Sequence, residues 1–167
     1  MSETIVRAAV VTVSDRSAKG EREDLSGPQL ADAVRASGGE VTSLTIVPDE
    51  IEAIEEELRR LADIERVPLI LTTGGTGLAP RDVTPEATRN ILEKEAPGIA
   101  EFARASTVPQ TKFAILSRGI AGVRRESLII NLPGSPKAVA ETFAALAPVL
   151  PHALAMLTGA TQEHPKS

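Results

Sequence analysis

The sequence lacks cysteine, tryptophan and tyrosine, and its only aromatic residues are three phenylalanines. Without cysteine there can be no disulfide bond, thiolate metal ligand or cysteine nucleophile. Proteins that bind single-stranded nucleic acid stack bases on aromatic side chains, and contact with phosphate backbones requires a basic surface. With 2% aromatic residues and a net charge of −5, we do not expect the chain to bind nucleic acid.

The sequence also lacks a signal-peptide pattern at its start and a run of about 18 apolar residues that would cross a bilayer. Its 167 residues, 42% hydrophobic and 25% charged, are typical of one globular domain. We therefore expect a cytoplasmic protein without a membrane partner. The expected domain covers residues 1–158, followed by a polar tail over residues 159–167.

Acidic residues are absent from residues 102–125, a stretch that carries five bases. One interpretation is a solvated basic face, and the other is a local site for an anionic ligand on an acidic protein. The composition leaves both open. The five bases are Arg104, Lys112, Arg118, Arg124 and Arg125.

Buried strands and amphipathic helices are expected to alternate along the chain. Apolar, β-branched runs predict strands over residues 5–14, 40–47, 67–72, 113–117 and 127–132. Helical spacing, caps and prolines predict helices over residues 26–37, from 49, 84–95, 99–106, 135–146 and 151–157. Residues 15–24 are expected to form a loop, and Gly119 and Gly122 a turn. This order predicts an α/β fold with three layers, a mostly parallel sheet flanked by helices.

A glycine-rich segment, Thr72-Thr73-Gly74-Gly75-Thr76-Gly77, directly follows the third predicted strand. Ligands of such sheets lie at the carboxyl ends of the strands, and glycines allow backbone N–H groups to form an anion nest. The spacing matches neither the P-loop nor the dinucleotide-binding fingerprint. We interpret the segment as a phosphate-binding loop, with a plain tight turn as the alternative.

Two aspartates occupy positions where a metal-bound phosphate could be held. Arg81 and Asp82 lie between the glycine-rich segment and the next helix, and Asp49 lies where the second strand ends. An arginine can bind phosphate oxygens, and Mg²⁺ binds nucleotides through one or two carboxylates and the phosphates. The simpler alternative is that both aspartates stabilise helix N-termini.

Polar residues close other strands as well. Ser14, Ser117 with Arg118, and Asn131 each stand at the end of a predicted strand, and Gly134-Ser135 precedes a helix start. Neither serine has a histidine and an aspartate at a recognisable spacing, so a serine-hydrolase site is not indicated. Polar groups at several strand ends suggest one long ligand or two adjacent ones.

Taken together, these segments resemble the molybdenum cofactor biosynthesis family of MogA/MoaB-type molybdopterin adenylyltransferases. The resemblance covers nearly the whole chain and is most specific in the glycine-rich segment and residues 81–87 (RDVTPEA). Residues 11–16, 115–118 and 128–134 also match the family pattern, and Asp49 stands where the family places its other key aspartate.

The resemblance implies transfer of AMP from ATP to the terminal phosphate of molybdopterin, with Mg²⁺ as cofactor and release of pyrophosphate. It assigns catalysis and metal binding to Asp49 and Asp82, and the nucleotide phosphates to Thr73, Gly74, Gly75 and Gly77. It implies that the substrate contacts and pocket come from Ser14, Arg81, Ser117, Arg118, Asn131, Gly134 and Ser135. Implied partners are molybdopterin, ATP, copies of the same chain in a trimer or hexamer, and the metal-insertion protein of the same pathway.

Two other functions stay open at this point. The chain could be a molybdopterin-binding scaffold module with the same fold but without turnover, or a nucleotide-processing hydrolase. Both Asp49 and Asp82 are present, which favours the enzyme over the scaffold. A hydrolase would act on its nucleotide without a pterin.

Overall fold

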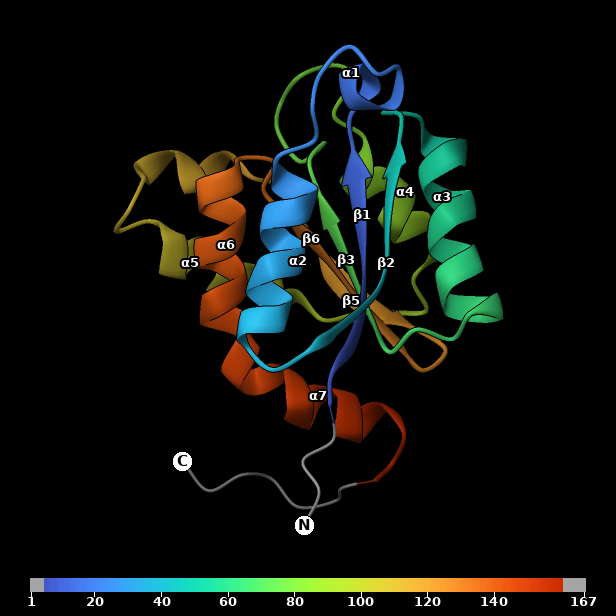
Figure 1. The fold of residues 1–167 in the computed structure, drawn as a ribbon. Coiled ribbons are helices and arrows are strands. Elements are labelled where there is room, and N and C mark those ends of the chain that lie inside the picture. Colours follow the sequence, from blue (N-terminus) through green and yellow to red (C-terminus); the bar gives the residue numbers. More distant parts are fainter. Residues whose placement is uncertain (1–4, 161–167) are drawn as a thin grey trace.

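The computed structural model describes residues 5–160, which form a six-stranded sheet between two layers of helices (Figure 1). The strands are β1 (Arg7–Val13), β2 (Glu40–Val47), β3 (Leu69–Thr73), β4 (Lys94–Glu95), β5 (Ala121–Arg124) and β6 (Ser127–Leu132). The α-helices are α1 (Asp15–Ala18), α2 (Ser26–Ala36), α3 (Ile51–Arg59), α4 (Thr84–Ile91), α5 (Pro97–Thr107), α6 (Pro136–Leu146) and α7 (Leu150–Leu157). A π-helical turn, η1 (Arg60–Ile64), and two 3₁₀ turns, η2 (Lys112–Leu116) and η3 (Ala147–Val149), complete the described elements.

The strands follow the order β2-β1-β3-β6-β5-β4. The first four are parallel, and β5 and β4 are added antiparallel. The central strands β1, β3 and β6 are buried almost throughout, which explains their nearly continuous apolar sequences. The predicted α/β fold with a mostly parallel sheet is therefore confirmed.

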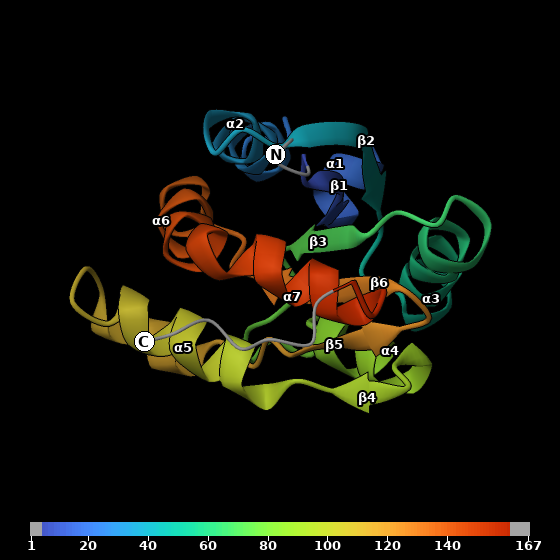
Figure 2. The same ribbon diagram turned by 90° about the horizontal axis from the view of Figure 1, so that it is seen from below.

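Each face of the sheet has its own apolar core. On one face, Leu30 of α2 and Phe143 of α6 pack with Val10 of β1. On the other face, Ile54 and Leu58 of α3 pack with strand residues of the opposite orientation. The view from below shows α2, α5 and α6 on one side of the sheet and α3 and α4 on the other (Figure 2). This confirms the three predicted layers.

Four local predictions are wrong. Residues 113–117 do not form a strand but belong to η2, where Phe113 and Ile115 are 67% and 69% exposed. Residues around Gly122 form β5 rather than a turn, and the chain reverses at Arg125, whose φ is 50°. The expected loop at 15–24 begins with the short helix α1, and α4 ends at Ile91, before the short strand β4.

The stretch Pro136–Leu157 is long and apolar enough, by length and composition alone, to cross a membrane. It consists of α6, η3 and α7 in succession. One face of α6 buries Val139, Phe143 and Leu146 in the core. This packing accounts for the apolar face of α6, but only 28% of the apolar segment is buried, and Val149 and Met156 are about half exposed.

Candidate functional site

The glycine-rich segment lies where the parallel strands end, at the top of the sheet in Figure 1. Gly74 and Gly75 have φ values of 100° and 69°, a conformation that side chains with a Cβ rarely adopt. The Gly74 N–H donates to Leu132 O at 3.2 Å, and the Thr73 hydroxyl donates to Pro133 O at 2.7 Å. The loop is therefore tied to the end of β6 and the segment that follows it.

The start of α4 supports the loop from its other side. The Thr84 hydroxyl donates to Gly74 O at 2.9 Å, and the Thr84 N–H donates to Gly75 O at 3.1 Å. The cap residue of α4 is Val83, and no side chain caps this helix, because the Thr84 hydroxyl is bonded to the loop. A Cβ on Gly75 would lie 2.2 Å from the Thr84 Oγ1, so only glycine fits there.

The N–H groups of Gly75, Thr76 and Gly77 donate to no acceptor within residues 5–160. Backbone N–H groups without protein acceptors, in a turn with two consecutive positive φ values, are typical of an anion nest. The geometry thus fits the interpretation of this segment as a phosphate-binding loop.

Asp49 and Asp82 flank this loop. A Cβ built on Gly75 would lie 3.1 Å from the Asp49 Oδ1, and one on Gly77 would lie 2.8 Å from the Asp82 Oδ2. Asp49 Oδ2 accepts the Asp15 N–H at 2.8 Å, and Asp82 Oδ2 accepts the Ala79 N–H at 3.0 Å. No side chain caps α3 or α4, so Asp49 is not a plain N-cap. The alternative for Asp82, a favourable charge near the start of α4, does not depend on a cap bond and stays open.

The electrostatic surroundings of Asp49 disfavour its charge. Burial raises the pKa of Asp49 above 3.8, and the negative charges of Asp15 and Asp82 raise it further. A cation between Asp49 and Asp82 would relieve this cost. Residues 5–160 contain no cluster of three or more metal-ligating side chains. Two carboxylates nevertheless fit Mg²⁺, because this ion completes its octahedral shell with water and substrate phosphates.

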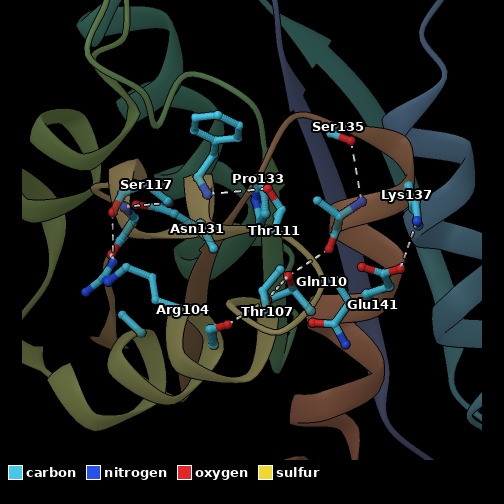
Figure 3. A pocket seen from close by; sticks show the side chains of 17 residues that line it. Arg104, Thr107, Gln110, Thr111, Ser117, Asn131, Pro133, Ser135, Lys137 and Glu141 are labelled. Carbon is cyan, nitrogen blue, oxygen red and sulfur yellow. Dashed lines mark hydrogen bonds and ion pairs between the residues drawn. The ribbon is translucent and has the colours of Figure 1, made fainter.

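A cavity of about 370 Å³ opens beside the loop, between α5, η2 and α6 (Figure 3). Three predicted substrate-binding residues line it: Ser117, Asn131 and Ser135. In Figure 3, Ser135 lies across the cavity from Ser117 and Arg104. Arg104 donates to the Gly119 and Ser117 carbonyl oxygens at 2.7 and 3.3 Å, which holds the Ser117 segment in place. The cavity combines an apolar wall with a few polar groups, as small-molecule sites do.

Asn131 joins the end of β6 to its neighbours. Its amide donates to the hydroxyls of Thr72 and Thr88 at 3.0 Å each, and its Oδ1 accepts the Ile120 N–H at 3.2 Å. Asn131 is 5% exposed. Because these bonds use both atoms of the amide, Asn131 shapes the cavity wall.

A smaller cavity, of about 180 Å³, lies on the other side of the Pro133–Pro136 segment. Ser14, Thr73, Gly74 and Gly134 contribute to its lining. The Ser14 hydroxyl accepts the Ser17 N–H at 3.2 Å and so caps α1. A Cβ on Gly134 would lie 3.1 Å from the Gly74 Cα, which places the two predicted segments in contact.

Arg81 and Arg118, both predicted to bind substrate, are engaged with the protein. Arg81 donates to Asp15 through Nε and Nη2 at 2.9 and 2.8 Å. Arg118 donates to Gly77 O and Asp82 O, each at 2.8 Å, and pairs with Glu86. Its guanidinium lowers the pKa of Glu86. Neither arginine lines the two cavities: Arg118 supports the loop through Gly77, and Arg81 is bonded to Asp15.

The acid-free stretch does not form one basic surface. Arg124 and Arg125 pair with Asp63 at the opposite end of the sheet, and Arg118 pairs with Glu86. Only Arg104 of the five bases lines the larger cavity. The structure therefore separates bases that the sequence places together, because acids from distant segments pair with three of them.

The predicted site residues thus form three neighbouring groups. Ser117, Asn131 and Ser135 line the larger cavity, and Ser14, Thr73, Gly74 and Gly134 line the smaller one. The remaining predicted residues line neither cavity. Gly75 and Gly77 belong to the loop itself, and the others lie around it: Asp49, Asp82, Arg81 and Arg118. The roles of Asp15, Thr84 and Arg104 were not predicted from the sequence. For Asp15 a signal existed, since it directly follows a strand end.

Comparisons with known proteins place the chain among molybdopterin-related proteins. Residues 9–152 match a family model described as a probable molybdopterin binding domain. The chain is 40% identical to a molybdopterin adenylyltransferase of Helicobacter pylori (strain J99) over 158 residues, covering 92% of this chain and 89% of that protein. It is 46% identical over 149 residues to the Drosophila melanogaster molybdenum cofactor synthesis protein cinnamon, covering 89% of this chain but only 25% of that longer protein.

A solved structure has the same fold. The molybdopterin biosynthesis enzyme MoaB from Thermus thermophilus superposes with a TM-score of 0.88 at 50% sequence identity. The match covers 93% of this chain and 98% of that one.

Proposed function

Because the chain belongs to the molybdopterin-binding domain family of molybdenum cofactor biosynthesis, we propose that it transfers AMP from ATP to molybdopterin. In this reaction a terminal phosphate oxygen of molybdopterin attacks the α-phosphorus of ATP. A new P–O bond forms, the bond between the α-phosphorus and its bridging oxygen breaks, and pyrophosphate leaves with the bonding electrons. The products are adenylyl-molybdopterin and pyrophosphate.

One observation carries this proposal. The N–H groups of Gly75, Thr76 and Gly77 have no acceptor within residues 5–160, and the loop that bears them is flanked by Asp49 and Asp82. Nucleotidyl transfer depends mainly on positioning and on neutralisation of phosphate charge. A loop of this kind supplies donors for phosphate oxygens, and the two carboxylates can hold the cation that accompanies ATP.

The two cavities suggest how the substrates divide between them. Molybdopterin fits the cavity of about 370 Å³, where Ser117 and Ser135 offer hydroxyl groups and Asn131 holds the wall. The nucleotide fits the smaller, more polar cavity at Ser14, Thr73 and Gly74, with its phosphates on the glycine loop. Residues 133–136 separate the two cavities and contact the loop at Gly74, so we expect the two phosphate groups to meet near this contact.

Asp49 and Asp82 are the residues that would hold Mg²⁺. When bound, Mg²⁺ neutralises phosphate charge and makes the α-phosphorus more electrophilic. Asp49 is held by the Asp15 N–H and Asp82 by the Ala79 N–H, each through Oδ2. Both Oδ1 atoms therefore remain available for a cation.

The test is to mix the protein with ATP, MgCl₂ and molybdopterin and to look for AMP covalently attached to the pterin. We expect adenylyl-molybdopterin and pyrophosphate in equal amounts. ATP consumption without molybdopterin would instead indicate a nucleotide hydrolase. Molybdopterin binding without AMP transfer would indicate a scaffold module.

We also expect the chain to self-associate, as a trimer or hexamer. Phe102, Phe113 and Ile115 are each more than half exposed and lie on neighbouring elements, α5 and η2. Burying these side chains in an interface would remove apolar surface from water. Light scattering at micromolar concentration should give a mass that is a multiple of 17.6 kDa, and a mass of 17.6 kDa would contradict the expectation.

A further inference from the structure

Asp15 and Asp49 are joined by a reciprocal pair of hydrogen bonds. The Asp15 N–H donates to the Asp49 Oδ2 at 2.8 Å, and the Asp49 N–H donates to the Asp15 Oδ1 at 3.0 Å. Each aspartate thus accepts the backbone N–H of the other. The pair fixes both the backbone and the carboxylate of Asp49, which follows the end of the edge strand β2.

Arg81 holds Asp15 from a third segment. Its Nε and Nη2 donate to the two carboxylate oxygens of Asp15 at 2.9 and 2.8 Å, the bidentate geometry of strong arginine–carboxylate pairs. Arg81 directly precedes Asp82 in the chain. Asp15 is therefore bonded to Asp49 and to the neighbour of Asp82, and so connects the segments that carry both carboxylates.

This arrangement occupies the face of Arg81 that a phosphate would need. The Nη2 and Nε groups point to Asp15, and Arg81 lines neither cavity. The Asp15 side chain is 27% exposed and that of Arg81 is 60% exposed, so the carboxylate is partly shielded while the guanidinium faces solvent. Direct phosphate binding by these two nitrogens would break the bonds that keep Asp15 in place.

We propose that Asp15 is a positioning residue that fixes Asp49 at the glycine loop, and that Arg81 acts through Asp15 rather than on a substrate phosphate. The inference rests on the proposed function for its effect on turnover. Its structural part concerns the Asp49 N–H and does not depend on any substrate.

The first test uses Asp15→Ala and Asp15→Asn. Asp15→Ala removes the acceptor of the Asp49 N–H, whereas Asp15→Asn keeps an oxygen that can accept it. We expect hydrogen exchange at the Asp49 amide to accelerate about tenfold or more in Asp15→Ala and by less in Asp15→Asn, which keeps the acceptor but loses the charged pair with Arg81. The Ile54 N–H, which donates to Glu50 O at 3.0 Å within the neighbouring helix, serves as the control for general unfolding.

Turnover should follow the same pattern. We expect kcat for AMP transfer to fall about 10- to 100-fold in Asp15→Ala, because a small displacement of a catalytic group has effects of this size. Asp15→Asn keeps an acceptor for the Asp49 N–H but loses the charged pair with Arg81, so its kcat should fall less than in Asp15→Ala, by about three- to tenfold. The Kd for molybdopterin should be unchanged in both. Unchanged exchange and kcat in Asp15→Ala, or an equal loss in Asp15→Asn, would overturn the role of Asp15.

A double-mutant cycle tests Arg81. If Arg81 acts through Asp15, adding Arg81→Ala to Asp15→Ala should leave kcat unchanged within about twofold. Multiplying losses would mean that Arg81 contacts the substrate independently and would overturn this part of the inference. If the wild-type protein transfers no AMP, the proposed function fails, while the exchange rates still decide whether Asp15 fixes Asp49.

Discussion

The aspartates at the two ends of the sheet differ in their hydrogen-bond partners. At the amino ends of the strands, Asp63 of η1 pairs with Arg124 at 2.7 Å and with Arg125 at 3.0 Å. Its oxygens accept three hydrogen bonds from these two guanidinium groups. At the carboxyl ends, the Asp49 and Asp82 carboxylates each accept one backbone N–H and pair with no arginine within residues 5–160.

This difference separates a structural acid from acids suited to bind a ligand. The guanidinium of Arg124 lowers the pKa of Asp63 below 3.8, so Asp63 is charged and its bonding capacity is filled by the protein. Burial raises the pKa of Asp49, and its Oδ1 accepts no hydrogen bond from residues 5–160. A charged group that the fold leaves only partly satisfied is a candidate for function.

The largest effect is expected when aspartates at the two ends of the sheet are replaced by asparagine and AMP transfer is compared. In Asp49→Asn and Asp82→Asn, we expect AMP transfer to fall about 100- to 1,000-fold, because the amide keeps the shape but loses the charge that neutralises the cation. Molybdopterin affinity and the thermal midpoint should change little, since neither residue lines the larger cavity. Asp63→Asn is the matched control and should retain full turnover. Normal turnover in both site variants would contradict the metal assignment.

Alanine substitutions at two glycines with positive φ distinguish the cost of steric crowding from the cost of backbone strain. Gly75 has a φ of 69° and would place a Cβ 2.2 Å from the Thr84 Oγ1, whereas Gly38 has a φ of 87° and open space around it. Gly38→Ala should cost about 1–2 kcal/mol of unfolding free energy from strain alone. Gly75→Ala should cost roughly 1 kcal/mol more from overpacking, and it should also impair AMP transfer. Urea unfolding measures both variants, and equal losses would show that the loop relaxes to admit the methyl group.

The ion pairs at the amino ends should contribute to stability in a pH-dependent way. Asp63→Asn should lose about 1–3 kcal/mol of unfolding free energy at pH 7, since hydrogen bonds to charged groups are lost. The folded-state pKa of Asp63 lies below its ordinary value of 3.8. This stabilisation is therefore present above pH 3.8 and is lost as the pH falls through the lower, folded-state pKa.

The difference between wild type and Asp63→Asn should accordingly shrink when urea unfolding is repeated at pH values below 3.8. Asp32→Asn removes the exposed pair between Asp32 and Arg35 and should cost less than about 0.5 kcal/mol. An equal loss in the two variants would mean that the Asp63 pairs contribute no more than a surface contact.

The smallest expected effect concerns the larger cavity. Ser117→Ala should weaken molybdopterin binding by about 0.5–1.5 kcal/mol through loss of one neutral hydrogen bond, while ATP affinity stays unchanged. Ser106→Ala on α5 is the control, because Ser106 bonds to its own helix and does not line the cavity. Calorimetric titration with each substrate measures both. An equal loss of molybdopterin and ATP affinity would show that Ser117 acts through the fold.

The spacing of apolar residues was sufficient to predict elements whose periodicity extends over several turns. The helix predicted from residue 49 forms as α3, and its Ile54 and Leu58 are buried in the core. The same reasoning failed at residues 113–117, because a short apolar run lacks the periodicity that distinguishes a buried strand from an exposed 3₁₀ turn. There the apolar residues face solvent, and no local feature of the sequence indicates this.

The sequence by itself determined the four parallel strands and the main helices between them, the position of the glycine loop, and the placement of Asp49 and Asp82 after strand ends. This was sufficient to bring these residues together, because parallel strands end at one edge of the sheet. Only the tertiary structure decided which partner each charge takes. Arg81 meets Asp15 across 66 residues and Arg124 meets Asp63 across 61, and such pairs depend on distances that arise only when the layers pack.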